Sequence, residues 1–369
     1  MILILTQCFP PRIGGIENLM FNLSYYLSKN NRVIVLADQH NIIKDALFDH
    51  KLKNKLLIRR FGGIKFFRKR NKIKELEKII NFQNVEVIIS DSWKSLEIPI
   101  KKLQNKKIPS ICLVHGNEII IKNQNHHKRI INTLKNVNKI ISNSEYTKNL
   151  LHKMNTQLNN IEVIYPGVSS FANIQEEEIK LIDGQPTLVT LARLEKRKGH
   201  KNILYAISKL KYQFPKIRYI IAGDGEEKYN LKSLVKNLDI SKNVIFIGSV
   251  SDAQKKYILN KSDLMIMPTI DETNKLSIEG FGISYIEAAL FGIPSIASNV
   301  GGTKEAVIHN ETGIVLNNLD DLENTICDLI LNEDKRKLYG QNAKKRATNE
   351  LNWDNQVQKY LNIISNISK

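Results

Sequence analysis

Cysteine is scarce in this chain of 369 residues, which contains only Cys8, Cys112 and Cys327. Because these three are odd in number and widely spaced, they argue against a disulfide framework and against a zinc cluster. No stretch approaches the roughly 20 uninterrupted apolar residues that a membrane-spanning helix needs. The opening MILILTQCFPPR lacks a basic leader and a small-residue cleavage site, so it predicts a buried strand rather than a signal peptide. Together these absences predict a protein of the reducing cytoplasm.

Acidic residues are scarce in the first half only. Residues 1–170 contain 28 Lys and Arg against 12 Asp and Glu, whereas residues 171–369 contain 27 against 25. A lysine bias of the whole genome would not leave the second half nearly neutral. The asymmetry predicts an anionic partner for the first half: nucleic acid, a membrane surface or a phosphorylated substrate.

Apolar runs and helical patterns alternate along the chain, and 42% of the residues are hydrophobic. The runs are continuous rather than alternating, which is typical of parallel strands covered on both faces. The pattern breaks near residue 167 and then restarts, so we expect an α/β fold of two doubly wound Rossmann-like domains that face a cleft. The predicted segments are an N-terminal domain over 1–167, a linker over 168–184, a C-terminal domain over 185–350, and a C-terminal helix over 351–369 that packs back on the N-terminal domain.

The segment EGFGISYIEA carries the clearest chemical signal. Glu279 and Glu287 lie eight residues apart around a glycine-rich turn that leads into a helix. Carboxylates accept hydrogen bonds from sugar hydroxyls, and the amides of Phe281–Ile283 suit a diphosphate. One element thus addresses both halves of a nucleotide sugar. The alternative is that Glu279 merely lies near the helix cap and that Glu287 lies on an exposed face.

Two further segments favour phosphate binding. Arg193 and Lys198 follow the first strand of the second domain, where they would clamp a diphosphate, although a solvated basic loop is the ordinary alternative. The pair of glycines at 14 and 15 follows the first strand of the chain and opens a helix, and a tight turn explains it equally well.

With these motifs the chain resembles the retaining glycosyltransferases of family 4, which have the GT-B fold. It is most similar to the bacterial phosphatidylinositol-mannoside mannosyltransferases, with which it shares its opening and a longer loop from Pro268 to Ile278. Two positions depart from the family pattern: Ala192 replaces the usual glycine, and Tyr165-Pro166-Gly167-Val168 replaces Pro-Asn-Gly-Val. The resemblance rests on the order and spacing of FPPRIGGIE, HGNE, SNSEYT, ARLEKRKGH, IAGDGEE, FIGSVSD, EGFGISYIEA and GIPSIASNVGGTKEAV.

The resemblance implies a site of defined roles. Arg193 and Lys198 would neutralise the leaving diphosphate, and His115 would lie near the reacting carbon. Transfer would retain the anomeric configuration by front-face displacement, without a cofactor or a metal. The sequence contains no Asp-x-Asp motif and no His/Cys cluster with ligand spacing. The implied donor-binding residues are Gly15, which approaches the phosphates; Glu279 with Phe281, Gly282 and Ile283 at the sugar; Glu287 at the ribose; and Val250, Asp252 and Lys255 at the base.

Asp252 favours a guanine nucleotide, because its carboxylate would pair with the ring N–H and the amino group of guanine. It is equally suited to be a helix N-cap. We therefore expect GDP-mannose as the donor, with a UDP-sugar-dependent enzyme of lipopolysaccharide or polysaccharide assembly as the alternative.

The basic excess predicts where the acceptor lies. In GIKFFRKRNKIK, Phe66 and Phe67 stand among cations that would bind anionic headgroups. The resemblance places a lipid or glycan acceptor on the first domain, so we expect a peripheral protein on the inner face of the cell membrane. A soluble protein with a lysine-rich composition is the alternative. The predicted membrane or acceptor face is Lys65, Phe66, Phe67, Arg68, Lys69 and Arg70.

Two other classes remain open. A nucleic-acid-binding protein would use the same basic segment but would have no use for the predicted donor site. A nucleotide-sugar epimerase would share the fold and consume the donor without an acceptor. The transferase requires a nucleotide sugar and an acceptor as partners, and no nucleic acid is expected.

Overall fold

The computed structural model describes residues 1–272 and 277–368. Its contacts divide the chain into two compact units. Unit 1 contains Met1–Gly167 and Trp353–Lys369, and unit 2 contains Val168–Asn352. The division falls after Gly167, so the segment expected as a linker, 168–184, is counted with unit 2. The last helix is counted with unit 1.

The described residues of unit 1 form a parallel sheet of seven strands in the order β3-β2-β1-β4-β5-β6-β7. Central strand β1 pairs with β2 through Leu3 and Ile34, and with β4 through Leu3 and Ile88. The strands are β1 (Ile2–Thr6), β2 (Val33–Asp38), β3 (Leu57–Phe61), β4 (Val87–Ser90), β5 (Ser110–Val114), β6 (Lys139–Ser142) and β7 (Ile161–Val163).

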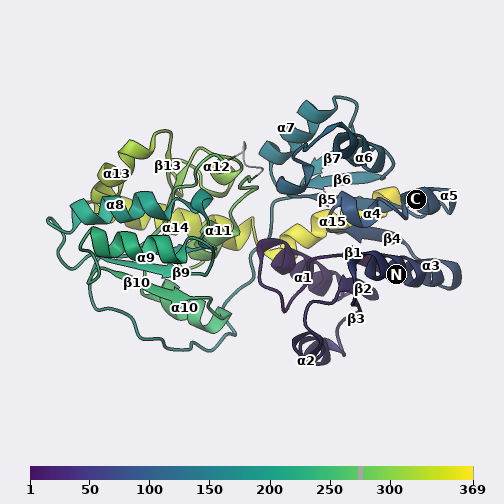
Figure 1. The fold of residues 1–369 in the computed structure, drawn as a ribbon, viewed down its shortest axis with the longest axis horizontal. Coiled ribbons are helices and arrows are strands. Elements are labelled where there is room, and N and C mark those ends of the chain that lie inside the picture. Colours follow the sequence, from purple (N-terminus) through teal and green to yellow (C-terminus); the bar gives the residue numbers. More distant parts are fainter. Residues whose placement is uncertain (273–276, 369) are drawn as a thin grey trace. The chain divides into compact units, whose positions relative to one another are not determined.

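Helices cover both faces of this sheet, as the continuous apolar strands predicted (Figure 1). One apolar cluster joins the sheet to α1 and α15, where Tyr26 stacks on Trp353 at 5.9 Å between ring centroids. The other joins it to α3, α4, α5, α6 and α7. The helices are α1 (Gly15–Leu27), α2 (Ile42–Leu52), α3 (Lys65–Phe82), α4 (Trp93–Leu96), α5 (Ile100–Asn105), the 3₁₀ turn η1 (Asn117–Ile119), α6 (Gln124–Leu134), α7 (Glu145–Met154) and α15 (Trp353–Ile367).

Unit 2 repeats the plan with a parallel sheet in the order β10-β9-β8-β11-β12-β13 over its described residues. Its main apolar cluster joins the sheet to α8, α9 and α13. The strands are β8 (Thr187–Leu191), β9 (Arg218–Ala222), β10 (Val244–Gly248), β11 (Leu264–Met267), β12 (Ser295–Ser298) and β13 (Gly313–Leu316). The helices are η2 (Lys196–Lys198), α8 (His200–Leu210), α9 (Lys228–Asn237), α10 (Asp252–Asn260), α11 (Ile283–Ala289), α12 (Thr303–Ala306), η4 (Leu319–Asp321), α13 (Leu322–Leu331) and α14 (Glu333–Asn349).

Both units are therefore doubly wound, and the predicted fold class is confirmed at this level. In each sheet the strand order reverses beside the first strand of the unit, β1 or β8. Ligands of such sheets bind where the strands end, next to this reversal. The loops after β1, β4 and β5 in unit 1, and after β8 and β11 in unit 2, are therefore the places to look for a site.

Candidate functional site

In unit 2 the buried carboxylate of Glu279 forms ion pairs with two cations of the loop after β8. The Lys198 ammonium lies 2.5 Å from its Oε2, and the Arg197 guanidinium donates to the same oxygen. All three side chains are largely buried. Burial alone would raise the pKa of the Glu279 carboxyl, but the charges of Lys198 and Arg197 outweigh it and hold that pKa below its ordinary value. The carboxylate is therefore ionised and presents an acceptor.

The backbone around this cluster is held on both sides. Gly199 has φ 71°, and a Cβ there would lie 2.0 Å from the carbonyl oxygen of Pro268, so no other residue fits. The Ile270 N–H donates to the Arg197 carbonyl at 2.8 Å. Glu279 in turn accepts from the Gly302 N–H at 2.9 Å through its carbonyl. The loop after β8 is thereby fixed to the loop that carries Glu279.

Arg193 and Lys198 were predicted to act as a pair, but the structure gives them different surroundings. Lys198 is buried on Glu279, whereas Arg193 has 67% of its side chain exposed and pairs with Glu195 at 2.7 Å. Arg197 was not predicted as a site residue. It stands in a run of three consecutive cations, Lys196 to Lys198, and nothing in that run signals which of them is buried.

Glu287 has its own buried cation. The Lys255 ammonium lies 2.7 Å from Glu287 and 3.2 Å from Asp252, so it joins α10 to α11. Burial disfavours the charge on Lys255, but the two carboxylates outweigh it and raise its pKa. The alternative of an exposed Glu287 is wrong, since the residue is 8% exposed.

The expectation that Asp252 might cap α10 is also wrong. Ser251 is the N-cap, because its hydroxyl oxygen accepts a hydrogen bond from the Gln254 N–H. The Gln254 side-chain oxygen in turn accepts a hydrogen bond from the Ser251 N–H. Asp252 is the first residue of the helix, with 68% of its side chain exposed. Its carboxylate is thus accessible at the helix start, one residue past Ser251 and two past the predicted base-side residue Val250.

The glycine-rich turn before α11 is fixed by contacts of its own residues and of the first turn of the helix. Phe281 is a core side chain at 2% exposure. Gly282 has φ 101°, and a Cβ on it would lie 2.6 Å from the ring of Tyr285. Ser284 Oγ donates to the Leu191 carbonyl at 2.6 Å, which fixes the first turn of α11, beginning at Ile283, to the end of β8. Within the longer loop noted from Pro268 to Ile278, positions 273–276 lie outside the described residues.

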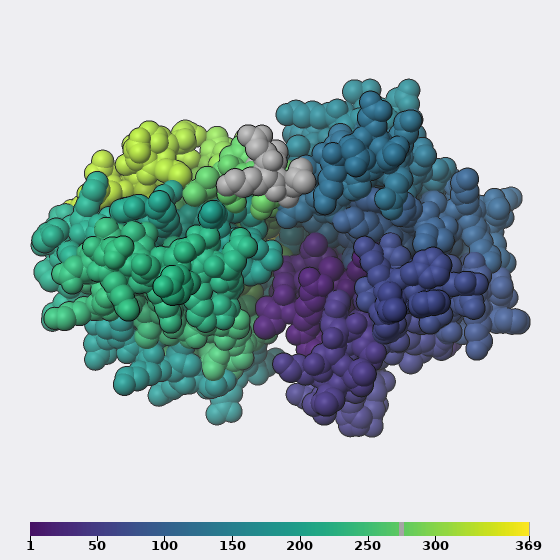
Figure 2. Space-filling model, viewed as in Figure 1, coloured from purple at the N-terminus to yellow at the C-terminus, as the bar shows by residue number. Residues whose placement is uncertain are grey.

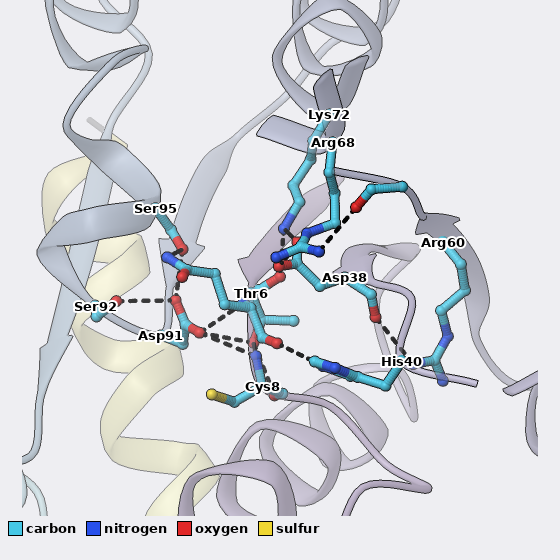
Figure 3. A network of polar contacts seen from close by, with 12 residues as sticks. Thr6, Cys8, Asp38, His40, Arg60, Arg68, Lys72, Asp91, Ser92 and Ser95 are labelled. Carbon is cyan, nitrogen blue, oxygen red and sulfur yellow. Dashed lines mark hydrogen bonds and ion pairs between the residues drawn. The ribbon is translucent and has the colours of Figure 1, made fainter. Parts of the chain in front are cut away.

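In unit 1, Asp91 organises the carboxyl ends of β1 and β4 (Figure 3). Its Oδ2 accepts from Thr6 Oγ1 at 3.0 Å and from the Gln7 N–H at 2.6 Å, and its Oδ1 accepts from Ser95 Oγ at 2.7 Å. This carboxylate fixes the start of the loop that leads to Gly15. There Gly15 is the first residue of α1, as predicted from the paired glycines.

His115 lies at the end of β5, next to this network. Its Nε2 is 3.0 Å from the carbonyl oxygen of Asp91. Because a carbonyl only accepts, Nε2 carries the proton, and in the neutral ring Nδ1 is an acceptor. The His115 backbone N–H donates to Glu118 Oε1 at 2.6 Å. The HGNE motif thus uses its glutamate to fix the histidine backbone.

The predicted membrane or acceptor face lies on the first turns of α3, and the structure divides it. Phe66 and Phe67 are 67% and 57% exposed, and Lys65 and Arg70 are also exposed. Arg68 instead turns inward and pairs with Asp38 at 2.9 Å, next to Lys72 (Figure 3). The sixth predicted residue, Lys69, is half-buried. The helix itself lies at the surface of unit 1, in the dark blue segment of Figure 2.

Within residues 1–272 and 277–368, no group of three His, Cys, Asp or Glu side chains lies close enough together to hold a metal ion. Over the same residues, no helix is both long and apolar enough to cross a membrane. The expectations of a metal-independent and cofactor-free reaction stay predictions.

Family models match both units. The model described as Glycosyltransferase Family 4 matches residues 13–170, and the model described as Glycosyl transferases group 1 matches residues 172–346. Together they span most of the chain.

Among curated proteins, a GDP-mannose-dependent alpha-(1-6)-phosphatidylinositol monomannoside mannosyltransferase of Mycobacterium tuberculosis is 28% identical over 172 residues. That match spans 46% of this chain and 45% of the relative, less than half of either. A GDP-mannose-dependent monoacylated alpha-(1-6)-phosphatidylinositol monomannoside mannosyltransferase of Corynebacterium glutamicum is 23% identical, over 98% of this chain and 97% of the relative.

Among solved structures, Anabaena HepE in complex with UDP has a TM-score of 0.78 at 19% identity, over 99% of each chain. Similarity at this level of identity establishes the fold. The prediction of a GT-B fold is confirmed.

Proposed function

The chain belongs to the glycosyltransferases, with a family 4 domain followed by a group 1 domain, and on this premise we propose that it moves a hexose from a nucleotide-diphosphate sugar to a membrane-associated lipid or glycan. We propose GDP-mannose as the donor, in line with the names of the mycobacterial and corynebacterial relatives. The observation that carries the proposal is the pair of buried, cation-held glutamates, Glu279 and Glu287, on the two sides of one glycine-rich turn.

Each part of a nucleotide sugar has a chemical counterpart in unit 2. Ionised Glu279 accepts hydrogen bonds from hydroxyls of the donor sugar, and Glu287 does the same for the ribose. Arg193 is exposed, so it can reach a diphosphate without breaking a buried contact, while Lys198 adds positive charge from behind. Asp252 has the exposed carboxylate that a guanine edge would use.

In the proposed reaction, the bond between the anomeric carbon and the diphosphate oxygen breaks as the acceptor oxygen forms its bond on the same face of the sugar. The departing phosphate oxygen takes the acceptor's proton. Negative charge grows on the diphosphate, and Arg193 and Lys198 stabilise it. His115 stays a proposed catalytic residue, because its Nδ1 is available to accept from a sugar hydroxyl when Nε2 is bonded to Asp91.

We further propose that unit 1 meets the membrane through the outward side of α3. Phe66 and Phe67 touch each other with ring centroids 5.5 Å apart and are both exposed, and exposed Lys65 and Arg70 flank them. Apolar rings between cations are the composition that anionic lipid surfaces retain. The protein would then be peripheral on the inner face of the cell membrane.

Thermal unfolding against GDP, UDP, ADP and their sugar conjugates tests the donor proposal. A ligand at about 100 times its dissociation constant adds roughly 2.7 kcal/mol of stability. Stabilisation by GDP alone supports the proposal. Stabilisation by UDP alone replaces the GDP-mannose proposal with a UDP-sugar-dependent transferase. This alternative is considered because HepE, which has a similar fold, was solved in complex with UDP. Stabilisation by no nucleotide overturns the transferase.

Product analysis separates the transferase from an epimerase. The transferase leaves free GDP and a glycosylated acceptor, and it consumes the donor faster when acceptor is present. An epimerase would convert the donor without acceptor and leave the new sugar attached to the nucleotide.

A further inference from the structure

The inward side of α3 carries cations that no carboxylate fully neutralises. Arg68 and Lys72 converge on Asp38, and Lys72 also donates to the Thr6 carbonyl at 2.7 Å (Figure 3). These two cations are therefore already bound to groups at the end of the sheet. Lys69, one residue beyond Arg68, is half-buried, and the charges that most affect its pKa are those of Glu97, Lys65 and Arg129.

A second group of cations surrounds the indole of Trp93 at the start of α4. The ring is fixed, because its Nε1 donates to the Glu118 carbonyl at 2.8 Å. The His126 ring packs edge-on against it at 5.4 Å between centroids. The Arg129 guanidinium carbon lies 5.5 Å from the indole centroid, and the Lys94 ammonium lies 5.9 Å from it.

The two groups lie on the same side of the sheet of unit 1, because α3, α4 and α6 all contribute to one apolar cluster. Arg129, which acts on Lys69, also lies on the Trp93 ring. Lys122 joins them, since its charge lowers the pKa of His126 and its backbone N–H donates to His126 Nδ1 at 3.5 Å. We call this set the α3–α6 cation cluster, and its members are Lys65, Lys69, Lys94, Lys122, His126 and Arg129.

Positive charge dominates the cluster. Glu97 binds Arg129 with both carboxylate oxygens, one of them at 2.8 Å, and its charge also acts on Lys69 and His126. Burial and then the charges of Lys94, Lys122 and Arg129 lower the pKa of His126, against Glu97. Burial likewise lowers the pKa of Lys69, against Glu97, with Lys65 and Arg129 adding to the effect of burial. Neighbouring cations thus add to the effect of burial on both groups, and a bound anion would counteract it.

We propose that the α3–α6 cation cluster binds the phosphate group of the acceptor. Several lysines and one arginine, with its planar guanidinium, surround a fixed indole. This set suits a phosphate mono- or diester, because its oxygens point in several directions. The acceptor role rests on the proposed transferase, whereas phosphate binding itself does not. The phosphate can belong to a lipid headgroup or to a soluble phosphorylated sugar, and the test separates the two.

Histidine NMR on the full chain tests the proposal. Glycerophosphoglycerol is the probe, because the charge of a phosphodiester is constant between pH 5 and 8, and glycerol is its control. A bound phosphate next to His126 raises the pKa of His126 by about one unit. Binding weakens as the pH rises through that pKa, because His126 loses its proton. A His126 pKa that does not move at saturating probe overturns the proposal.

Two substitutions on the same helix provide a matched pair. Lys69→Gln removes a half-buried cation of α3, and Lys78→Gln removes an exposed one. We expect Lys69→Gln to weaken probe binding about tenfold and to raise the acceptor KM with little change in kcat. We expect Lys78→Gln to change neither. Equal losses in both variants mean that binding follows net charge, and they overturn the proposal.

Vesicles identify the source of the phosphate. A lipid headgroup is supported if phosphatidylglycerol vesicles retain the protein, phosphatidylcholine vesicles do not, and the retention depends on Lys69 more than on Lys78. Binding of the soluble diester with the same dependence and no retention supports a soluble phosphorylated sugar. GDP binding is measured on the same samples: if it fails while the His126 shift remains, the transferase proposal falls and phosphate binding stands.

Discussion

The ammonium nitrogen of Lys255 lies 2.7 Å from a carboxylate oxygen of Glu287, and this largely buried ion pair joins α10 to α11. Removing one partner leaves the other charge buried alone. We expect Lys255→Met to cost about 3 kcal/mol in the free energy of unfolding and to weaken nucleotide binding. Urea unfolding and calorimetric titration with GDP measure the two effects.

The double variant Lys255→Met/Glu287→Met is the control, because two apolar side chains replace the pair without an unpaired charge. It should recover much of the lost stability but not the nucleotide affinity. An unchanged stability of Lys255→Met would mean that the pair is not maintained in solution.

Glu279 makes the stability of unit 2 depend on pH. Its pKa in the folded protein lies below the ordinary value of 4.5, because Lys198 and Arg197 outweigh the effect of burial. The ionised carboxylate therefore contributes stability that is fully present above pH 4.5 and is lost as the pH falls through the folded-state pKa. Urea unfolding of the wild type and of Glu279→Gln should show a gap at pH 7 that narrows toward pH 3. A gap that widens toward pH 3 would contradict the assignment.

Arg193 and Arg197 separate ligand binding from folding. Arg197→Gln leaves Glu279 with one cation in place of two, and we expect a loss of about 3 kcal/mol in stability. Arg193→Gln changes an exposed side chain, so its stability should stay within about 0.5 kcal/mol, whereas the affinity for nucleotide diphosphates should fall about tenfold. Thermal unfolding with and without GDP measures both. Equal stability losses would contradict the difference in burial.

Asp252 is the test of base preference. Since Ser251 caps α10, Asp252→Asn leaves the helix start intact. We expect the affinity for GDP to fall about tenfold, because the amide replaces one of the two acceptor oxygens with a donor. The affinity for UDP should not change. Calorimetric titration of both nucleotides gives the ratio, and a parallel loss for UDP would remove Asp252 from the base site.

Phe66 and Phe67 are the test of membrane contact. The double variant Phe66→Ala/Phe67→Ala should reduce retention on phosphatidylglycerol vesicles about tenfold, because two exposed rings no longer enter the interface. Phe82→Ala at the other end of α3 is the matched control, since Phe82 is 82% exposed. Sedimentation with vesicles at low salt measures retention. The same retention in all three proteins would contradict the membrane proposal.

Much of the fold followed from the continuous apolar runs, because a strand covered on both faces has little polar sequence. The strand β3 and the helix α2 have no such signal in the sequence. In β3, LIRRF, two of five residues are arginines, and its Arg60 is held by Asp49 at 2.7 Å, a partner the local sequence does not reveal. In α2, exposed Ile42 and Ile43 disturb the helical pattern of apolar residues.

The start of α3 at Lys65 has no clear signal in the sequence. Its first turn has no acidic residue and no side-chain cap, so the usual start signals are missing. Pairing of Arg68 with Asp38 holds these turns instead. In the site, the spacing of the two glutamates was enough to find both, whereas the buried position of Arg197 depends on contacts that only the folded loop makes.

The helix α15 belongs to unit 1, although the 185 residues from Val168 to Asn352 separate it from the rest of that unit. Five of its side chains complete the apolar cluster over β1 and α1: Trp353, Val357, Tyr360, Ile363 and Ile364. During synthesis, unit 2 can therefore finish folding before unit 1, whose early strands must wait for residues near 364 to leave the ribosome. The unit that is translated first is therefore the last to complete its fold. Until then its apolar face is exposed, and chaperones can bind it.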